Sequence, residues 1–350
     1  MSIRMGVSRT LAVLLSVSLS TSALTGCRIG PGQAAMTAPQ IVGVVVKTFG
    51  NPFFASLVKG AQQEGKALGI TVKAYAGTKD GDTASQIKAI EELIAQRAQG
   101  ILITPSGNEV LPAVDKARKA GLLVIALDSP TDPANAVDAT FATDNFGAGQ
   151  AIGQWAHGQL DPAAARIAML DLSADRIPVD VARDQGFLNG FGIDTANPSK
   201  IGDETDRRIV GHADTGGSVD GGKQAMTELL AKSPTINLVY TINEPAAAGA
   251  YEVLKSAGKA KGVIIVSVDG GCEGVRNVES GIIGATSMQF PLRMARLGLD
   301  AVIDHSLTGQ LPPNTPGMAF FNTGVQLIAS KPVAGLYSKD PAWGAKNCWG

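Results

Sequence analysis

The sequence predicts an α/β fold of two doubly wound, Rossmann-like lobes, and two observations carry this prediction. From Ile41 onward, short β-branched runs alternate with stretches of helical spacing. This is the pattern of parallel sheets that are covered by helices on both faces. The strand-like runs are many for one open sheet and divide about evenly near Asp144, so we expect two sheets rather than one.

The predicted elements follow one another in regular order. The strands are the runs 41–46, 71–76, 100–105, 123–128, 139–144, 166–172, 207–213, 237–243, 263–269, 282–288 and 324–329. Helical spacing between strands is clearest on two apolar faces, formed by Phe54, Leu57, Val58, Ala61 and Leu68, and by Ile87, Ile90, Leu93 and Ile94. Because Asn51 is a good helix N-cap and Pro52 suits the first helical position, we expect the first helix to begin directly after the first strand.

Composition limits the class of partner. The chain has 350 residues, a formal net charge of -1 and only 17% charged residues, without a dense lysine and arginine cluster. A nucleic-acid surface needs such a cluster. The length suits two domains of ordinary size. Composition therefore favours a neutral small molecule as the partner. We also expect a monomer.

The N-terminus predicts export. Arg4 and Arg9 precede an apolar stretch, "LAVLLSVSLSTSAL", that is too short for a permanent membrane span and is typical of a secretory signal. The stretch ends in "LTGC", which resembles the bacterial lipobox and predicts a lipid-modified Cys27 that anchors the chain to a membrane. The alternative is an unmodified signal cleaved nearby, for instance after Ala23. Residues 28–39 have the composition of a flexible tether.

If Cys27 carries the lipid, Cys272 and Cys348 remain. An even pair in an oxidising compartment predicts a disulfide that fastens the C-terminal "NCWG" to the segment "DGGCEG". The alternative is a reactive thiol, but no histidine lies near either cysteine in the sequence.

Candidate binding residues follow the predicted strands, because ligands of such folds lie outside the carboxyl ends of the strands. These residues are Lys47, Thr104, Asp128, Asp144, Asp171, Asn243, Asp269 and Gln289, with Arg183 in a helical stretch. Their mixture of hydrogen-bond donors and acceptors suits the hydroxyl groups of a sugar. The alternatives are that the aspartates cap helices or form turns, that Asn243 is a helix cap, and that Arg183 is a surface ion-pair partner.

Phe53 and Phe54 fall in the first turn of the first predicted helix. Aromatic rings pack on the apolar face of a sugar ring, so this pair suits the same cleft. The alternative is that both rings belong to the core, although helical spacing does not bury two adjacent residues on one face.

Taken in order, these motifs resemble one known family. "NPFF", "LD" at Asp128, "TDN" at Asp144, "RDQGF" at Arg183, "TINEPAAAGA" at Asn243, "VSVDGG" at Asp269 and "GATSMQ" at Gln289 are similar to the ribose-type (type I) periplasmic sugar-binding proteins of ABC importers. The resemblance covers the chain from Ile41 onward. Within that family, "VVKTFGNPFF", "INEPAAAGAY", "DGGCEGV" and "CWG" look most like the fructose-binding branch.

The resemblance implies a role for each matched residue. Phe53 and Phe54 would sandwich the sugar, while Asn51 and Asp128 would bind hydroxyl groups from the first lobe. The second lobe and the hinge would contribute Arg183, Asn243, Asp269 and Gln289. Departures from the ribose pattern are Thr104, Ser129 and Lys47, and the absence of an aromatic residue near Thr215.

The resemblance also implies an architecture and a mechanism. Residues 40–143 with 290–322 would form one lobe and residues 144–289 with 323–350 the other, joined by a hinge near Thr143, Gln289 and Thr323. The lobes would close on a monosaccharide and present it to a membrane permease with its cytoplasmic ATPase. In an alternative reading, the closed form signals to a receptor kinase.

Two enzyme signals compete with this interpretation. "GAGQAIG" at 147–153 approaches a dinucleotide fingerprint, with Asp171 near the distance of a ribose-binding acid, but its last glycine is one position late. Asp128 and Asp269 could be the paired carboxylates of an exported hydrolase. The sequence has no G-x-S-x-G or H-E-x-x-H motif, and His157, His212 and His305 are scattered. We therefore expect a binding protein without catalytic residues, cofactor or metal.

Overall fold

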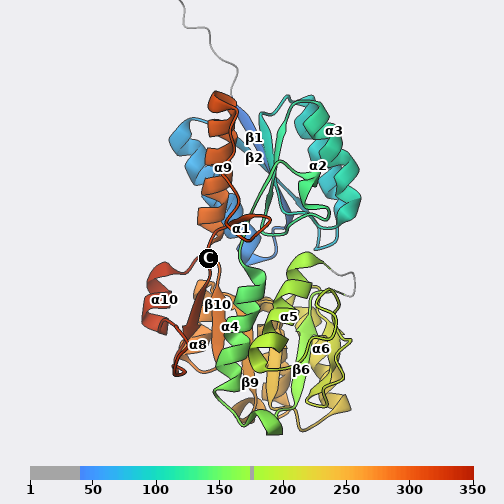
Figure 1. The fold of residues 1–350 in the computed structure, drawn as a ribbon, viewed down its shortest axis with the longest axis vertical. Helices are drawn as coiled ribbons and strands as arrows, with labels where there is room; N and C mark the ends of the chain where they lie inside the picture. Colours follow the sequence, from blue (N-terminus) through green and yellow to red (C-terminus); the bar gives the residue numbers. More distant parts are fainter. Residues whose placement is uncertain (1–39, 174–176) are drawn as a thin grey trace, which may run out of the picture. The chain divides into compact units, whose positions relative to one another are not determined.

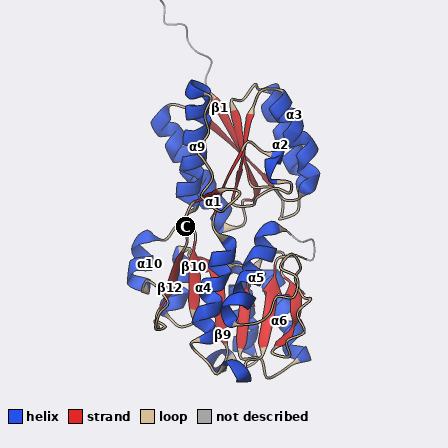
Figure 2. Cartoon of the chain, in the orientation of Figure 1, coloured by secondary structure: helices blue, strands red, loops and turns tan. Residues whose placement is uncertain are grey.

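The computed structural model describes residues 40–173 and 177–350, and its strands form two six-stranded sheets flanked by helices (Figures 1 and 2). The predicted signal peptide, the tether and Cys27 lie outside the described residues. Within the described ranges, no helix combines the length and the apolar character needed to cross a bilayer.

The first sheet has the strand order β11-β5-β4-β3-β1-β2, and its strands pair in parallel. The strands are β1 (Ile41–Thr48), β2 (Thr71–Gly77), β3 (Gly100–Ile103), β4 (Leu123–Leu127), β5 (Ala139–Ala142) and β11 (Phe321–Asn322). One face packs on α1 (Pro52–Leu68) and α9 (Pro291–Thr308), and the other on α2 (Thr83–Ala95) and α3 (Leu111–Lys119) (Figure 1). Short 3-10 helices cover Asn108–Val110 and Ala134–Ala136.

The second sheet repeats this plan in the order β12-β10-β9-β8-β6-β7. Its strands are β6 (Ile167–Asp171), β7 (Ile209–Asp214), β8 (Leu238–Thr241), β9 (Ile264–Asp269), β10 (Ala285–Met288) and β12 (Gln326–Ala329). Its helices are α4 (Asn145–His157), α5 (Pro178–Phe191), α6 (Val219–Lys232), α7 (Glu244–Ser256), α8 (Cys272–Glu279) and α10 (Pro341–Asn347), with 3-10 turns at Pro162–Ala164 and Ala260–Gly262. One face packs on α4 and α5, the other on α6, α7 and α8.

The chain passes between the two sheets three times, which confirms the expected doubly wound fold with a three-segment hinge. The passages lie between β5 and α4, between β10 and α9, and between β11 and β12. Thr143, Gln289 and Thr323 are fully or almost fully buried there. The Thr323 amide donates to the Ala142 carbonyl, and the Gln289 amide donates to the Asp269 carbonyl. The passages are therefore tied to the strands beside them.

Two features of the sheets differ from the prediction. The two-residue strand β11 was not predicted, because so short a segment carries no alternation of apolar residues. The last strand, β12, runs antiparallel to β10, although parallel sheets were predicted. It enters its sheet from β11 after a short connection at the hinge, without the crossover helix that a parallel pair requires.

The first helix begins as predicted. The Asn51 side-chain oxygen accepts the Phe53 amide at 2.9 Å, and Pro52 is the first helical residue. Leu68, which was placed on the apolar face, is 45% exposed instead. It occupies the last helical position before Gly69, whose φ of 72° ends the helix.

The glycines of the "GAGQAIG" stretch allow α4 and α5 to pack backbone against backbone. A Cβ atom at Gly149 would overlap the Arg183 carbonyl oxygen, and one at Gly153 would overlap that of Phe187. On α5, a Cβ at Gly186 or Gly190 would likewise overlap carbonyl oxygens of α4. The stretch is therefore a helix-packing surface inside α4, not a phosphate-binding turn between a strand and a helix.

We expect Gly149→Ala to lower the free energy of unfolding by about 2 kcal/mol, because the added methyl group forces the two helix backbones apart. Gly262→Ala is the matched control, since a Cβ there would meet no atom within 4 Å and its φ is not positive. Urea denaturation followed by circular dichroism measures both. Equal stability of the two variants would contradict this account of the α4–α5 contact.

Candidate ligand-binding site

The carboxyl ends of strands from both sheets border a cavity with about 370 Å³ of space not filled by protein atoms. It is lined by Lys47, Asn51, Phe53, Phe54, Asp80, Asp128, Leu172, Val179, Arg183, Ile242, Asn243, Asp269 and Gln289. Of the candidate binding residues taken from the sequence, Thr104, Asp144 and Asp171 are not in this set, and all the others are.

Asp144 does not line the cavity. Its carboxylate accepts the Gly147 amide at 2.9 Å and caps α4, which is the structural role that was weighed against binding. The next residue, Asn145, serves the site instead. Its amide donates to the Thr143 carbonyl, and its oxygen accepts from Arg183 Nε at 2.9 Å. Sequence reasoning missed Asn145 because its effect passes through Arg183.

Arg183 is buried and fixed by protein groups. Besides the Asn145 oxygen, its guanidinium binds the Ile242 carbonyl, which accepts from Nη1 at 2.9 Å. Asn145 at the start of α4 and Ile242 just after β8 therefore fix the Arg183 side chain, which lines the cavity and is not a surface ion-pair partner.

Phe53 and Phe54 form the aromatic wall of the cavity. Their rings meet edge to face with centroids 5.4 Å apart, and Trp349 packs against Phe53 in the same way at 5.5 Å. Both phenylalanines also belong to the core cluster of the first sheet, so packing and cavity lining are combined rather than alternative. A larger adjoining cavity shares Asn51, Phe54 and Asp269 with this one.

The second lobe contributes an aliphatic surface in place of an aromatic ring. Leu172, Val179 and Ile242 line the cavity there. Thr215, near which no aromatic residue was found in the sequence, instead donates its hydroxyl to the Asp171 carbonyl at 2.7 Å. Sequence reasoning missed the aliphatic residues because nothing distinguishes them from core residues.

Lys47 faces a carboxylate that was also missed. Its Nζ atom lies 3.5 Å from Asp80 Oδ2, and the lysine side chain is 2% exposed. Asp80 lies in the turn after β2, three residues beyond the strand end, where an inspection limited to strand ends does not reach. Its Oδ1 atom and Oε1 of Gln289 are buried without a hydrogen-bond partner among the described residues. Both are free to accept from a ligand.

Two aspartates hold unusual backbone conformations at matching places in the two sheets. Asp128 follows β4 with φ 67°, and Asp269 ends β9 with φ 146°. Such conformations cost about 1–3 kcal/mol each and persist where the surroundings enforce them. The Ser129 hydroxyl donates to Asp128 Oδ2 at 3.0 Å, and Gln289 Nε2 donates to Asp269 Oδ1 at 2.9 Å. The two carboxylates are thus preorganised.

Burial controls the protonation of these carboxyl groups. It raises the pKa of Asp128, against the nearby charges of Arg183 and Lys47. Burial also raises the pKa of Asp269 to about 7, and the Asp128 charge adds to the rise while Arg183 opposes it. The charge of Arg183 thus opposes the rise of pKa at both aspartates.

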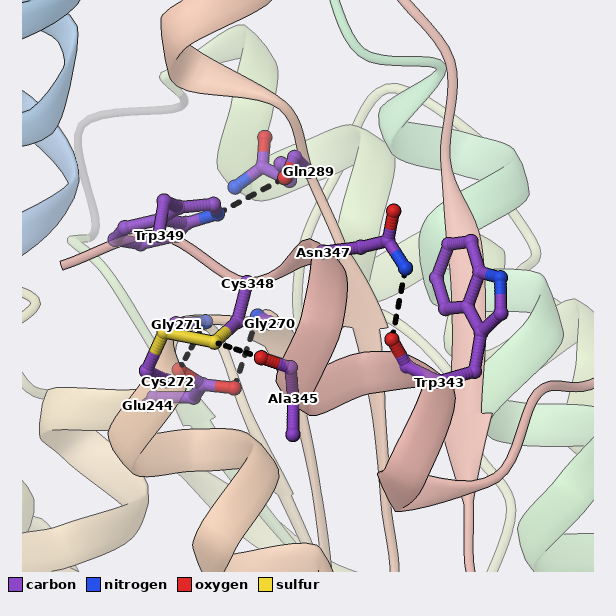
Figure 3. The surroundings of a disulfide bond; sticks show 10 residues. All are labelled: Glu244, Gly270, Gly271, Cys272, Gln289, Trp343, Ala345, Asn347, Cys348 and Trp349. Atoms are coloured by element: carbon purple, nitrogen blue, oxygen red, sulfur yellow. Dashed lines mark hydrogen bonds between the residues drawn. A yellow bond between two sulfur atoms is a disulfide. The ribbon is translucent and has the colours of Figure 1, made fainter.

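The loop after Asp269 is fixed by Glu244 and by a disulfide (Figure 3). Glu244 accepts hydrogen bonds from the amides of Gly270 and Gly271 at 2.9 and 3.0 Å, and from the Thr286 hydroxyl at 2.8 Å. Burial and the Asp269 carboxylate raise the pKa of Glu244 to about 8. We did not single out Glu244 in the sequence.

The disulfide joins Cys272 to Cys348 and holds the C-terminal tail at the site (Figure 3). The Cys272 amide donates to the Trp349 carbonyl at 2.9 Å. The Trp349 indole donates to the Gln289 carbonyl at 2.9 Å. The tail therefore supports both Gln289 and the ring of Phe53.

We expect Glu244 to make the stability of the ligand-free chain depend on pH. Its pKa is higher in the folded chain, at about 8, than the ordinary 4.5, so its contribution is complete below about pH 4.5 and is lost as the pH rises through 8. In Glu244→Gln this loss is absent. Between pH 5 and 8.5, the unfolding free energy of the wild type should fall more steeply than that of Glu244→Gln, by at most about 1.4 kcal/mol per pH unit.

Glu273→Gln is the control, because Glu273 lies in the same segment and is exposed. Thermal and urea unfolding across this pH range measure all three proteins. A Glu244→Gln variant whose pH profile runs parallel to that of the wild type would show that Glu244 stays ionised in the folded chain.

Comparison with known proteins agrees with this architecture. Residues 42–310 match the family model described as a periplasmic binding protein domain. The D-allose-binding periplasmic protein of Escherichia coli (strain K12) is 29% identical over 278 residues, which cover 77% of this chain and 86% of that protein. The ribose import binding protein of Bacillus subtilis (strain 168) is 27% identical over 304 residues, 84% of this chain and 92% of that protein.

A solved structure has the same fold. It is an ABC transporter solute binding protein from Agrobacterium vitis with bound D-fucose, with a TM-score of 0.72 and 25% identity, and the match covers 89% of this chain and 100% of that chain. The relatives are binding proteins of transport systems, in agreement with the prediction that this chain is not an enzyme. The family model spans most of the chain, and the chain belongs to the type I periplasmic binding proteins.

Proposed function

We propose that this chain is the sugar-binding protein of an ABC importer and that its ligand is a monosaccharide, fructose in particular. The observation that carries the proposal is the cavity in which an aromatic wall faces fixed polar side chains from both lobes. The names of the relatives support the class, since one binds D-allose and another is a ribose import protein.

The charges of the cavity favour a neutral ligand. Two cationic side chains, Lys47 and Arg183, lie among three carboxyl groups, Asp80, Asp128 and Asp269. This set has no excess of positive charge, so it is unsuited to a sugar phosphate or sugar acid. A sugar hydroxyl donates to one group and accepts from another, which matches the mixture of Asp, Arg, Asn and Gln side chains. Phe53 and Phe54 would cover the apolar face of the sugar ring.

Capture would proceed by closure of the lobes about the hinge. Lys47, Asp80 and Asp128 come from the first lobe, whereas Arg183, Asn243 and Asp269 come from the second. A sugar that binds both sets stabilises the closed form over the open one. Asn145 joins the hinge to the site, because it binds both the Thr143 carbonyl and Arg183. The closed form would then deliver the sugar to a membrane permease with its ATPase.

The proposal that the ligand is fructose has narrower support than the proposed class of protein. It comes from four segments that look most like the fructose-binding branch, "VVKTFGNPFF", "INEPAAAGAY", "DGGCEGV" and "CWG". Lys47 lies in the first of them and forms the pair with Asp80. Asn243 lies in the second, where it caps α7 and also lines the cavity.

We expect fructose to raise the melting temperature of the purified chain. A ligand at about 100 times its dissociation constant stabilises the folded state by about 2.7 kcal/mol, a shift of a few degrees. The panel is fructose, ribose, allose, glucose, galactose, xylose, arabinose and myo-inositol. Arg183→Ala and Asp269→Ala should abolish the shift, while Arg207→Ala, an exposed residue of the same lobe, should retain it.

Each outcome of this panel decides something. A shift with another sugar alone would keep the class of function and discard fructose. No shift with any sugar would overturn the proposed function, and full affinity in both the Arg183 and Asp269 variants would overturn the site.

We also propose that Cys27 carries a lipid anchor, on the basis of the "LTGC" lipobox that follows the apolar stretch. Cys27→Ser should move the protein from the membrane fraction to the soluble fraction of the cell envelope. Ser22→Ala, in the same leader but outside the lipobox, should leave the protein in the membrane fraction. Retention of the Cys27→Ser variant in the membrane fraction would refute the anchor.

A further inference from the structure

A second cluster of ionisable side chains lies on the far side of Arg183, in the second lobe. Asp171 ends β6, Asp184 is on α5 and His212 is on β7. His212 Nδ1 lies 2.7 Å from Asp171 Oδ2 and 3.8 Å from Asp184 Oδ2. One ligand atom from each of the three lies within 4.8 Å of the other two. The fold thus brings together residues that are scattered in the sequence.

Among the residues that the structure describes, the cluster has more carboxyl groups than cationic side chains in contact with them. Glu204 binds the other ring nitrogen of His212, and Asp180 lies one helical turn before Asp184 on α5. Asp171, Asp180 and Asp184 are almost completely buried. His212 contacts three of the four carboxyl groups, and the charge of Arg183, whose guanidinium binds Asn145 and Ile242, also acts on Asp180. Buried carboxylates require compensating positive charge.

Asp171 and Asp184, the two aspartates that contact His212 Nδ1, each have a buried oxygen atom that is free to bind something more. Asp171 Oδ1 and Asp184 Oδ2 have no hydrogen-bond partner among the described residues. Asp184 is completely buried, and its unpartnered oxygen is the one that faces His212. Buried polar atoms rarely lack a partner, so a carboxylate oxygen without one beside an imidazole nitrogen is available to a ligand.

Glu204 supplies the support that a metal-binding histidine requires. Its Oε1 atom lies 2.6 Å from His212 Nε2. A carboxylate at that nitrogen keeps the proton there and leaves Nδ1 as the ligand atom. Nδ1 is the nitrogen that faces Asp171 and Asp184.

We propose that Asp171, Asp184 and His212 bind a divalent transition-metal ion of the zinc class, with Glu204 holding the imidazole in the required tautomer. Two carboxylate oxygens and one imidazole nitrogen leave a fourth position of a tetrahedral ion for water. Calcium is disfavoured, because it takes six to eight oxygen ligands and this cluster offers a nitrogen and few oxygens. On binding, His212 Nδ1 coordinates the ion in place of its hydrogen bond to Asp171, and any proton on Nδ1 passes to solvent.

The ion would brace the wall of the sugar cavity from behind. Asp184 follows Arg183 on α5, and Asp171 precedes Leu172, a cavity residue. The Asp171 carbonyl also accepts the Thr215 hydroxyl and amide. Metal binding does not need the sugar, so this proposal is tested separately from the proposed function.

The test is a calorimetric titration of Zn²⁺ into the full chain after treatment with EDTA, without added sugar. The wild type should bind one ion per chain, and Co²⁺ in its place should give the visible absorption of a low-coordinate site. Asp184→Asn should weaken binding more than about 100-fold, beyond the 10–100-fold loss expected for the supporting variant Glu204→Gln. Asp220→Asn, an exposed aspartate of the same lobe, and His157→Gln should bind as the wild type does.

Circular dichroism establishes whether each variant is folded. If Asp184→Asn does not fold, the Zn²⁺ affinity of Glu204→Gln is compared with that of the wild type instead. No binding of Zn²⁺ or Co²⁺ by the folded wild type would overturn the proposal and leave the cluster held by shared protons. Unchanged affinity in folded Asp184→Asn and Asp171→Asn variants would overturn it as well. Loss of binding in His157→Gln alone would place the ion elsewhere.

Discussion

The candidate site depends on the buried guanidinium group of Arg183 and its contacts. It is fixed by the Asn145 side chain and the Ile242 carbonyl, and its charge acts on Asp128 from the first lobe and Asp269 from the second. Burial alone would drive both aspartates toward the neutral form. The charge of Arg183 therefore favours the ionised form of a carboxyl group in each lobe, and its side chain is fixed by Asn145 beside the hinge.

The position of Arg183 follows from the contact between α4 and α5. Gly149 lies where any larger residue would meet the Arg183 carbonyl, so the two helix backbones approach closely and the arginine side chain starts near the hinge. The same α4 begins at Asp144, whose capping role leaves the next residue, Asn145, free to bind Arg183. The glycine pattern that suggests a nucleotide fingerprint in the sequence is thus one cause of the cavity's geometry. Packing and electrostatics are not separate features here.

Much of the fold and most of the cavity could be predicted from sequence, because parallel strands bring their carboxyl ends to one edge of each sheet. That rule finds Lys47, Asp128 and Asp269 without knowledge of which strands are neighbours. It does not find Asp80, which a turn carries back to Lys47, or Glu244, which acts through the backbone of Gly270 and Gly271. The sequence also does not predict the antiparallel direction of β12 or the pairing of the two-residue β11, since periodicity indicates a strand but not its pairing.

Helix α5 also explains why two clusters of charge lie so close together. It buries Asp180, Arg183, Asp184 and Gln185. A helix of an ordinary globular protein buries an apolar stripe and leaves its charges in water. Here Arg183 is directed to the cavity, and Asp184 to His212 on the other side. Each side then needs its own compensation, by a partner of opposite charge or by hydrogen bonds. A polyol on the Arg183 side and a cation on the Asp184 side would meet that requirement.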